Sequence, residues 1–395
     1  MKKLLEILPW TEFLDVHLIK DTTVFAYYFH KQYGVPVEIV FCDNKKTGTK
    51  LNDYNGIKLI KLLNTYNFVT PPRFRQIVKF HKFINIFKKF LRSKKGTYSH
   101  VMFFHITPYT MILSRFVKKI NPSVQIYVKA DSGCIKGLSF LLFKHLLTYV
   151  DLFSIEKNKE AERLQKSFPG FSHKIFYVPN GFDNEIITTN NIKINSYDDK
   201  QNCLITAARL GSYQKNTEFL LRFLDNLKFN GWKVKLIGEY TQEVFKQYKE
   251  ICAHNKEFAD AVELTGNISN REELFTYYNN AKIFVLPSRW ESFGLAALEA
   301  MSFGCFPVIS PIDSADTLTA NGTFGKVLPL DQNLWSSEIQ GLIDDEEIMN
   351  RSYQTIIDYC SQKLSMNEIS KSICFKKFFS SEKVYETANK RGEVL

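Results

Sequence analysis

Four charged residues in the second half of this 395-residue chain suit chemistry on an anionic substrate that carries hydroxyl groups. Arg209 and Lys215 lie six positions apart, and seven residues separate Glu291 from Glu299. Two fixed cations can stabilise negative charge that develops during a reaction without the help of a metal ion. Arg can bind two oxygens at once, whereas Lys acts as a point charge. A carboxylate such as that of Glu299 accepts hydrogen bonds from paired hydroxyls, for example those of a ribose.

A strand–loop–helix–strand unit must position the two glutamates. The apolar run 283–286 ends in a Pro-Ser pair, an alanine-rich helical segment follows, and 306–309 is a second apolar run. The N-terminus of such a helix has unpaired N–H groups and a positive dipole end, so it is a natural seat for phosphate. Gly294 has no side chain and lets an anion approach the backbone closely. Glu291 lies in the loop before the helix, where a sugar attached to the phosphate would lie.

These residues resemble the motifs of a known family. Glu291-x7-Glu299, with Phe293-Gly294-Leu295 between the acids, resembles the E-x7-E segment of retaining glycosyltransferases with the GT-B fold. These enzymes form family 4, also described as glycosyl transferases group 1. The stretch from Arg209 to Lys215 is similar to the Arg-Leu…Lys segment of the same family, with Asn216 in the place of its common glycine.

The resemblance implies that a sugar is transferred from a nucleotide diphosphate donor with retention at the anomeric carbon, and family frequency favours UDP. It implies that no metal and no other cofactor is needed, because Arg209 and Lys215 stabilise the leaving diphosphate. Glu291 would contact the donor sugar and Glu299 the ribose. Further donor contacts are expected from Ser292, Phe293, Gly294, Leu295, Gly238, Asn267 and Ile268, of which the last two would present backbone atoms to the nucleobase.

Each of these residues also has a plainer interpretation. Glu291 is explained as an acid favoured by a helix dipole, and Glu299 as a solvated helix residue. Arg209 and Lys215 are explained as ordinary surface cations, and Gly238 as part of a strand-end turn. The order of the four charged residues along one chain favours the functional interpretation.

The order of apolar runs indicates an α/β fold with two domains. Strands are predicted at 4–8, 37–41, 101–105, 125–129, 152–155 and 175–178, and again at 202–207, 233–237, 262–264, 283–286 and 306–309. By resemblance, this is the GT-B architecture: two Rossmann-like domains facing a cleft, and a C-terminal helix crossing back to the first domain. The expected parts are an acceptor-binding domain at 1–182, a polar linker at 183–200, a nucleotide-sugar-binding domain at 201–365 and the returning helix at 366–395.

The first domain offers fewer chemical signals. His105 ends one predicted strand and Asp131 follows the next; both are candidate catalytic residues near the sugar. Asp131 matches the family by strand order and His105 by chemistry. His17, Lys20 and Asp21 suit acceptor hydroxyls, although surface polarity explains them equally well. The glycine-rich loop that often follows the first strand in the family is missing here.

Basic charge is concentrated in the first half. The net charge is +11, and residues 1–180 contain 29 Lys/Arg but only 12 Asp/Glu. Nine of these cations and no acid lie in 71–100, where apolar residues recur at helical spacing. This pattern predicts contact with an anionic membrane surface through 71–96. A core-packing helix with a solvated basic face is one alternative; nucleic-acid binding is another, which we do not expect.

Other features of the composition indicate a cytoplasmic protein, and the family resemblance implies a peripheral place on the inner face of the plasma membrane. The seven cysteines are scattered without metal-ligand spacing, which favours a reducing compartment without disulfides. The N-terminal apolar run is too short for a signal peptide. Charged residues interrupt the longest apolar stretch, 137–155, so a transmembrane helix is not expected.

The sequence therefore favours a retaining, metal-independent hexosyltransferase. Its acceptor would be a saccharide, lipid-linked, in the biosynthesis of capsule, lipopolysaccharide or another cell-surface polysaccharide. A nucleotide-sugar epimerase or a phosphorylase on the same fold is one alternative. A non-catalytic basic protein that binds membranes or nucleic acid is the other.

Overall fold

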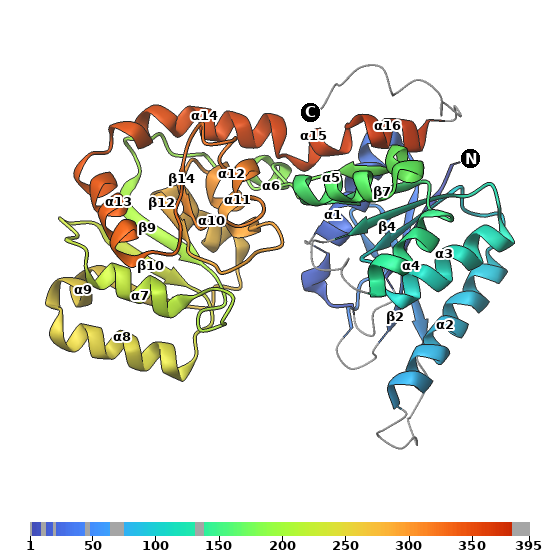
Figure 1. The fold of residues 1–395 in the computed structure, drawn as a ribbon, viewed down its shortest axis with the longest axis horizontal. Coiled ribbons are helices and arrows are strands. Elements are labelled where there is room, and N and C mark those ends of the chain that lie inside the picture. Colours follow the sequence, from blue (N-terminus) through green and yellow to red (C-terminus); the bar gives the residue numbers. More distant parts are fainter. Residues whose placement is uncertain are drawn as a thin grey trace. The chain divides into compact units, whose positions relative to one another are not determined.

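Two structural units make up the described part of the chain. A computed structural model describes residues 2–8, 13–18, 21–43, 48–63, 75–130 and 138–380. The first unit holds the described residues up to Pro179 together with those from Ile369 onward, and the second unit is Asn180–Glu368. Each unit contains one largely parallel sheet covered by helices (Figure 1). The predicted α/β class is confirmed.

The first sheet has the strand order β3-β4-β2-β1-β5-β6-β7-β8. All its pairs are parallel except β3 with β4. Every residue of β1 is buried, Glu6 included, because parallel sheets are covered on both faces. The strands are β1 (Leu4–Leu8), β2 (Val37–Asp43), β3 (Asp53–Tyr54), β4 (Ile57–Leu63), β5 (His100–Phe104), β6 (Gln125–Ala130), β7 (Leu152–Ile155) and β8 (Ile175–Tyr177).

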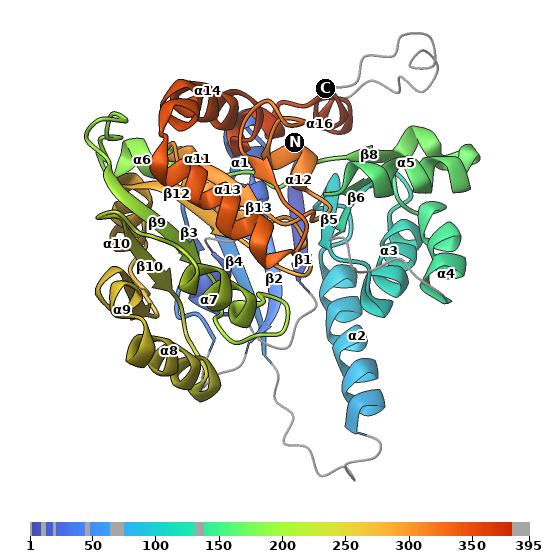
Figure 2. The same cartoon turned by 60° about the vertical axis from the view of Figure 1, so that its left-hand side comes forward.

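Helices cover both faces of this sheet. They are η1 (Asp15–His17), α1 (Asp21–Tyr33), α2 (Arg75–Ser93), α3 (Pro108–Ile120), α4 (Leu138–Leu147), α5 (Asn158–Ser167) and η3 (Pro169–Lys174). Helices α2 and α3 run side by side (Figure 2). Leu5 and Ile7 share a core with α2, α3 and α4. On the opposite face, Phe104 and Tyr127 pack against aromatic side chains of α1.

The basic segment corresponds to α2, and its apolar stripe is used by the core. Phe83, Ile84, Phe87 and Leu91 are buried there, which is the core-packing interpretation. The exposed residues at its C-terminal end include Lys89, Arg92, Lys94 and Lys95. An anionic surface would therefore meet the basic face of this part of α2 and not its apolar stripe. Residues 71–74 of the predicted segment lie outside the described residues.

The C-terminal segment returns to the first unit, as the GT-B architecture implies. It contains α15 (Met366–Ser370) and α16 (Ile373–Phe379). The ring of Phe375 lies 4.7 Å from that of Phe29 in α1, and His100 Nε2 lies 3.0 Å from the carbonyl oxygen of Phe378. These contacts hold α16 against the first sheet. Residues 381–395 lie outside the described part.

The second sheet has the order β11-β10-β9-β12-β13-β14, and all its pairs are parallel. Helices α7 and α8 lie on one face, and α11 and α14 on the other (Figure 1). The strands are β9 (Gln201–Ala207), β10 (Lys233–Ile237), β11 (Val262–Gly266), β12 (Ala281–Leu286), β13 (Phe306–Ile309) and β14 (Lys326–Val327). The helices are α7 (Thr217–Asp225), α8 (Gln242–His254), α9 (Lys256–Ala261), α10 (Arg271–Asn280), α11 (Leu295–Ser302), α12 (Ala315–Leu318), α13 (Gln332–Asp344) and α14 (Glu347–Lys363).

The stretch 183–200, which we expected to be a polar linker, lies within the second unit. It contains α6 (Glu185–Thr189), and Ile192 and Ile194 pack against the core of that unit. The amide of Asn195 also donates a hydrogen bond of 2.9 Å to Asn279 Oδ1. The linker prediction failed because it rested on the polar composition of this stretch and overlooked its few apolar residues.

Candidate functional site

The strongest candidate site lies where the second sheet reverses its strand order. The chain leaves β9 for β10 on one side, whereas β12 pairs with β9 on the other. In open α/β sheets, ligands bind at such a switch point, outside the carboxyl ends of the strands. The loop after β9 carries Arg209 and Lys215, and the loop after β12 carries Glu291. The structure therefore brings three of the four predicted charged residues to one edge.

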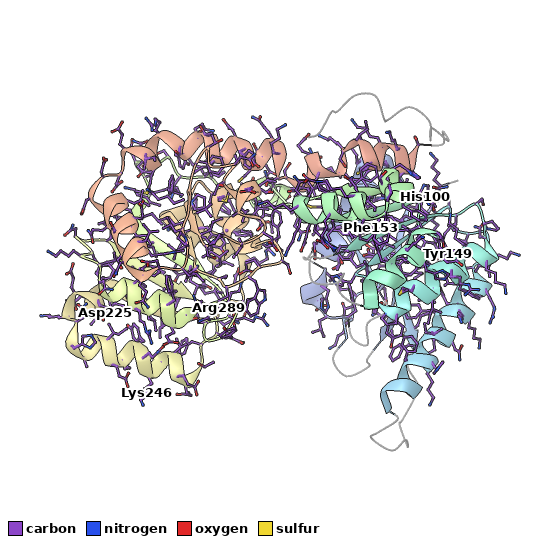
Figure 3. The ribbon with its side chains drawn as sticks, viewed as in Figure 1. His100, Tyr149, Phe153, Asp225, Lys246 and Arg289 are labelled. Carbon is purple, nitrogen blue, oxygen red and sulfur yellow. The ribbon has the colours of Figure 1, made fainter. Side chains whose placement is uncertain are left out.

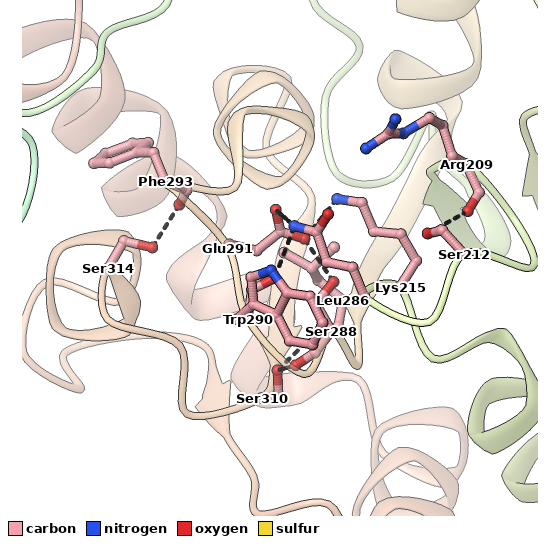
Figure 4. A network of polar contacts seen from close by, with 11 residues as sticks. Arg209, Ser212, Lys215, Leu286, Ser288, Trp290, Glu291, Phe293, Ser310 and Ser314 are labelled. Carbon is pink, nitrogen blue, oxygen red and sulfur yellow. Dashed lines mark hydrogen bonds and ion pairs between the residues drawn. The ribbon is translucent and has the colours of Figure 1, made fainter. Parts of the chain in front are cut away.

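Lys215 and Glu291 form an ion pair between these two loops (Figure 4). Lys215 Nζ lies 2.5 Å from Glu291 Oε1, with 15% and 7% of the two side chains exposed. The hydroxyl of Ser288 donates to the same oxygen at 2.6 Å, and Gln214 Nε2 donates to Oε2 at 3.3 Å. These contacts meet the needs of a nearly buried carboxylate. An ammonium has three N–H donors, so Lys215 can also serve a phosphate.

Arg209 projects from the same loop as Lys215. Figure 4 shows its guanidinium directed to the side on which the Lys215 amine meets Glu291. Arg209 is exposed, and its backbone oxygen accepts a bond of 3.0 Å from Ser212 Oγ. Within the part of the chain that the structure describes, its guanidinium makes no hydrogen bond or ion pair. The planar donor group is thus available to an anionic ligand.

The conformation of Asn216 explains why an asparagine can stand where the resembling motif commonly has glycine. It has φ of 56° and stands at the N-cap of α7, a left-handed conformation that Asn tolerates better than most residues. Its side chain is buried and donates a hydrogen bond of 3.2 Å to the carbonyl oxygen of Pro287. The asparagine therefore keeps the backbone shape that a glycine would give and joins the two loops.

The start of α11 is shaped by Gly294, which has φ of 89°. A Cβ there would lie 3.3 Å from both Leu286 Cδ2 and Leu318 Cδ1, so a larger residue would be both strained and crowded. The side chain of Phe293 is buried in the core, so only its backbone is available to a ligand. Ser292 and Leu295 are exposed beside the unpaired N–H groups of the helix start.

Glu299 lies in α11 and pairs with Arg271 from α10. The distance from Arg271 Nη2 to Glu299 Oε1 is 3.1 Å, and 19% of the Glu299 side chain is exposed. Burial raises the pKa of Glu299, and the positive charge of Arg271 opposes the rise. The hydrogen bond that we expected from a ribose is thus supplied in part by the protein itself, while the exposed part of the carboxylate stays open to a diol.

The loops after β10 and β11 have more structural roles. Gly238 has φ of 134°, and a Cβ there would lie 1.7 Å from the carbonyl oxygen of Ala208. The amide of Gly238 also donates to Gly266 O at 2.8 Å. Gly238 therefore allows neighbouring strand ends to touch, as the strand-end interpretation held. Asn267 is exposed, and Ile268 packs partly against the core.

Two candidate residues of the first unit take part in hydrogen bonds within their own segment. His17 Nδ1 accepts a hydrogen bond of 2.9 Å from the Leu14 amide, and Asp21 Oδ1 accepts one of 3.0 Å from the Thr22 amide. Both side chains thus take part in local structure before and at the start of α1. His105 follows β5 with φ of 63°, a strained conformation that often marks a functional position. Lys20 and Asp131 lie outside the described residues.

Three residues of the site were missed by reasoning from sequence. Gln214 and Ser288 hold Glu291, and Arg271 holds Glu299. The role of Ser288 could have been predicted, because it lies in the loop three residues before Glu291. The role of Arg271 could not have been predicted from the sequence, since its contact with Glu299 depends on the packing of α10 against α11.

The described residues contain neither a metal-binding cluster nor a membrane-spanning helix. No group of three or more His, Cys, Asp or Glu side chains in this part of the chain is arranged to hold a metal ion. Among the helices described, none combines the length and the apolar character needed to cross a membrane.

Comparison with known proteins gives the same fold and a family match over part of the chain. Residues 188–356 match the family model of glycosyl transferases group 1. A probable sucrose-phosphate synthase of Thermosipho melanesiensis is 25% identical over 246 residues, covering 59% of this chain and 53% of that protein. The amylovoran biosynthesis glycosyltransferase AmsD of Erwinia amylovora is 24% identical over 276 residues, covering 62% and 76%. The chain thus spans about half the length of the first of these relatives.

Among solved structures, HepE of Anabaena in complex with UDP has a TM-score of 0.66 and 14% identity, covering 95% of this chain and 99% of that one. Likeness at this identity shows the fold, which is that of GT-B glycosyltransferases. The motifs around Arg209 and Glu291 lie within the matched region of the family model. The likeness to glycosyl transferases group 1 is therefore carried by residues 188–356 of the second unit, which make up less than half of the chain.

Proposed function

We propose that the protein transfers a sugar from a nucleotide diphosphate donor to a saccharide. The observation that carries this proposal is the Lys215–Glu291 pair at the switch point of the second sheet, with the unpaired Arg209 guanidinium beside it. Cations at this edge suit a diphosphate, and a fixed carboxylate next to them suits the hydroxyls of an attached sugar. UDP is the favoured nucleotide because HepE, which shares the fold, binds it.

Each part of the donor has a partner in this arrangement. The diphosphate lies against Arg209, Lys215 and the start of α11, whose N–H groups add further donors. The ribose diol contacts the exposed part of the Glu299 carboxylate. The sugar contacts Glu291, which its neighbours hold in place before the donor arrives. A site organised in advance needs little rearrangement during the reaction.

For the chemical step we propose front-face substitution with retention and without a metal. The acceptor hydroxyl attacks the anomeric carbon on the side from which the diphosphate departs. The C–O bond to the diphosphate breaks, and the proton of the hydroxyl passes to a phosphate oxygen. Lys215 and Arg209 stabilise the charge left on the diphosphate. Chemical trapping of a covalent sugar–protein adduct would contradict this step.

For the acceptor we propose a lipid-linked saccharide at an anionic membrane surface. The similarity to AmsD supports a role in polysaccharide synthesis, and the exposed cations at the end of α2 supply an electrostatic contact. Lys89→Glu, Arg92→Glu and Lys94→Glu together should abolish co-sedimentation with phosphatidylglycerol vesicles at low salt, whereas Lys246→Glu should not. Unchanged co-sedimentation of the triple variant would reject the membrane contact.

A thermal-shift screen with UDP, GDP, ADP and their sugars tests the donor assignment. A ligand at 100 times its Kd stabilises a protein by about 2.7 kcal/mol, which is readily measured. We expect stabilisation by one nucleotide and by its sugar conjugates. A product assay with and without added saccharide then separates a transferase from an epimerase, which needs no acceptor. Absence of stabilisation by every nucleotide would reject the proposal.

A further inference from the structure

An exposed aromatic cluster borders the candidate donor site, and the proposed function does not account for it. Tyr213 is 71% exposed and Trp290 is 51% exposed. In contrast, Trp232 and Trp335 of the same unit are buried. Large aromatic side chains on a surface lose favourable burial, so adjacent exposed ones often mark a binding site.

The cluster is held in a fixed arrangement by Arg289. Its guanidinium carbon lies 4.0 Å from the centroid of the Tyr213 ring, and its Nη1 donates to the Tyr213 carbonyl oxygen at 2.6 Å. The Tyr213 and Trp290 rings lie 5.8 Å apart and are tilted by 51°. Such a stacked guanidinium limits the motion of the ring that it covers. The two rings therefore form a preformed shelf, which we call the aromatic shelf.

Gln214, which contacts Glu291, also holds the aromatic shelf. The amide of Arg289 donates to Gln214 O at 2.8 Å, and Gln214 Nε2 donates to Trp290 O at 2.9 Å. Gln214 Nε2 also reaches Glu291, the residue next to Trp290 in the chain. Figure 4 shows Trp290 beside the Lys215–Glu291 pair. The shelf and the carboxylate expected to hold the donor sugar thus share one rigid pair of loops.

The chemistry of the shelf matches a sugar ring. Aromatic faces pack against the C–H face of a pyranose, while guanidinium, phenol and indole N–H groups bond its hydroxyls. Along the chain, Glu299, which we expect to contact the ribose, comes after Glu291, whereas Trp290 comes directly before it. The shelf is therefore on the other side of Glu291 in the sequence from the expected ribose contact. We propose that the aromatic shelf of Tyr213, Arg289 and Trp290 binds the acceptor saccharide next to the donor sugar, an inference that rests on the proposed function.

The test uses the full chain, saturated with UDP, on an array of immobilised mono- and oligosaccharides. Wild-type protein should bind a subset of the saccharides. Trp290→Ala and Tyr213→Ala should each lower this signal by about 10-fold, as expected for the loss of one aromatic stacking surface. Trp290→Phe should restore most of it. Phe245→Ala, which removes another exposed ring of the same unit, should leave it unchanged.

Stabilisation by UDP is measured in parallel and separates this inference from the proposed function. It should be the same in wild-type protein, Trp290→Ala and Tyr213→Ala, because the shelf is placed outside the nucleotide site. A lost UDP shift in Trp290→Ala would show that the ring binds the nucleotide and overturn the inference. Equal array signals in wild type and both alanine variants, or no array signal in wild type, would overturn it while the UDP shift still stands.

Discussion

The two sheets reverse their strand order at comparable places, between β1 and β5 in the first unit and between β9 and β12 in the second. The polar residues of the loops at these places make different kinds of contact. In the second unit, Lys215 and Glu291 join two loops across the switch point. In the first unit, the Leu14 amide donates a hydrogen bond to His17 and the Thr22 amide donates one to Asp21, both within one segment.

The contacts across the switch point of the second unit make a site that is organised in advance. Glu291 receives hydrogen bonds from Ser288 and Gln214 as well as the contact with Lys215, so its position is fixed without a ligand. The strain of His105 is the main sign of function in the first unit.

The largest expected effect is that of Lys215→Gln. Glutamine keeps a hydrogen-bond donor for Glu291 but removes the positive charge that stabilises the leaving diphosphate. We expect kcat to fall by about 10²–10³-fold, measured with the nucleotide sugar found in the screen. Lys246→Gln is the matched control, since Lys246 is 79% exposed on α8 (Figure 3). A kcat within twofold of wild type would remove Lys215 from the mechanism.

Glu299→Gln should weaken UDP binding by about 10–100-fold, because hydrogen bonds to a charged group contribute about 1.5–3 kcal/mol. Burial raises the pKa of Glu299, so the wild-type affinity should begin to fall at a higher pH than an ordinary glutamate would give. The affinity is full above this pKa and is lost as the pH decreases through it. Calorimetric titration at several pH values should show this loss in wild type and not in Glu299→Gln; the same pH profile in both would contradict it.

Gly238→Ala tests whether the strand ends of the second unit must touch. A Cβ would strike the carbonyl oxygen of Ala208 and would occupy a left-handed backbone. We expect the free energy of unfolding to fall by at least about 2 kcal/mol in urea denaturation. Gly341→Ala is the control: its Cβ would meet nothing within 4 Å in α13, and it should stabilise by about 0.5–1 kcal/mol. Equal stability of Gly238→Ala and wild type would refute the close contact.

The smallest effect is expected from His17→Ala in the first unit. The variant loses the acceptor of the Leu14 amide, which should lower the free energy of unfolding by about 0.5–1.5 kcal/mol. Stabilisation by UDP should not change. His254→Ala, a surface control in the second unit, should lose less. A weaker UDP shift in His17→Ala would show that the loops of the first unit also hold the donor, and the contrast between the units would fail.

Many strands could be predicted from the sequence because buried parallel strands are often rich in consecutive apolar residues. In β12, such a run ends at a Pro-Ser pair, which marks the end of the strand. The strand β4 was missed because Lys58 and Lys61 interrupt its apolar residues. A signal was present, since Asn55-Gly56, both with positive φ, forms the tight turn between β3 and β4.

Site residues could be predicted from the sequence where they form a motif with fixed spacing. They could not be predicted where their contacts depend on how helices pack. Glu291, Glu299, Arg209 and Lys215 stand in one order along the chain. The bond between Arg271 and Glu299 spans 28 residues and depends on how two helices pack. The positive φ of His105 likewise depends on its surroundings, because such a backbone is uncommon in residues other than glycine.

The central claim is that the switch point of the second sheet binds a nucleotide diphosphate through Arg209 and Lys215. Calorimetric titration of UDP into wild-type protein and into the double variant Arg209→Gln/Lys215→Gln tests it most directly. We predict one binding site in wild type, with an affinity that falls as salt rises, and an affinity at least about 10-fold lower in the double variant. Equal affinity in the two proteins, or no binding to wild type, would contradict the claim.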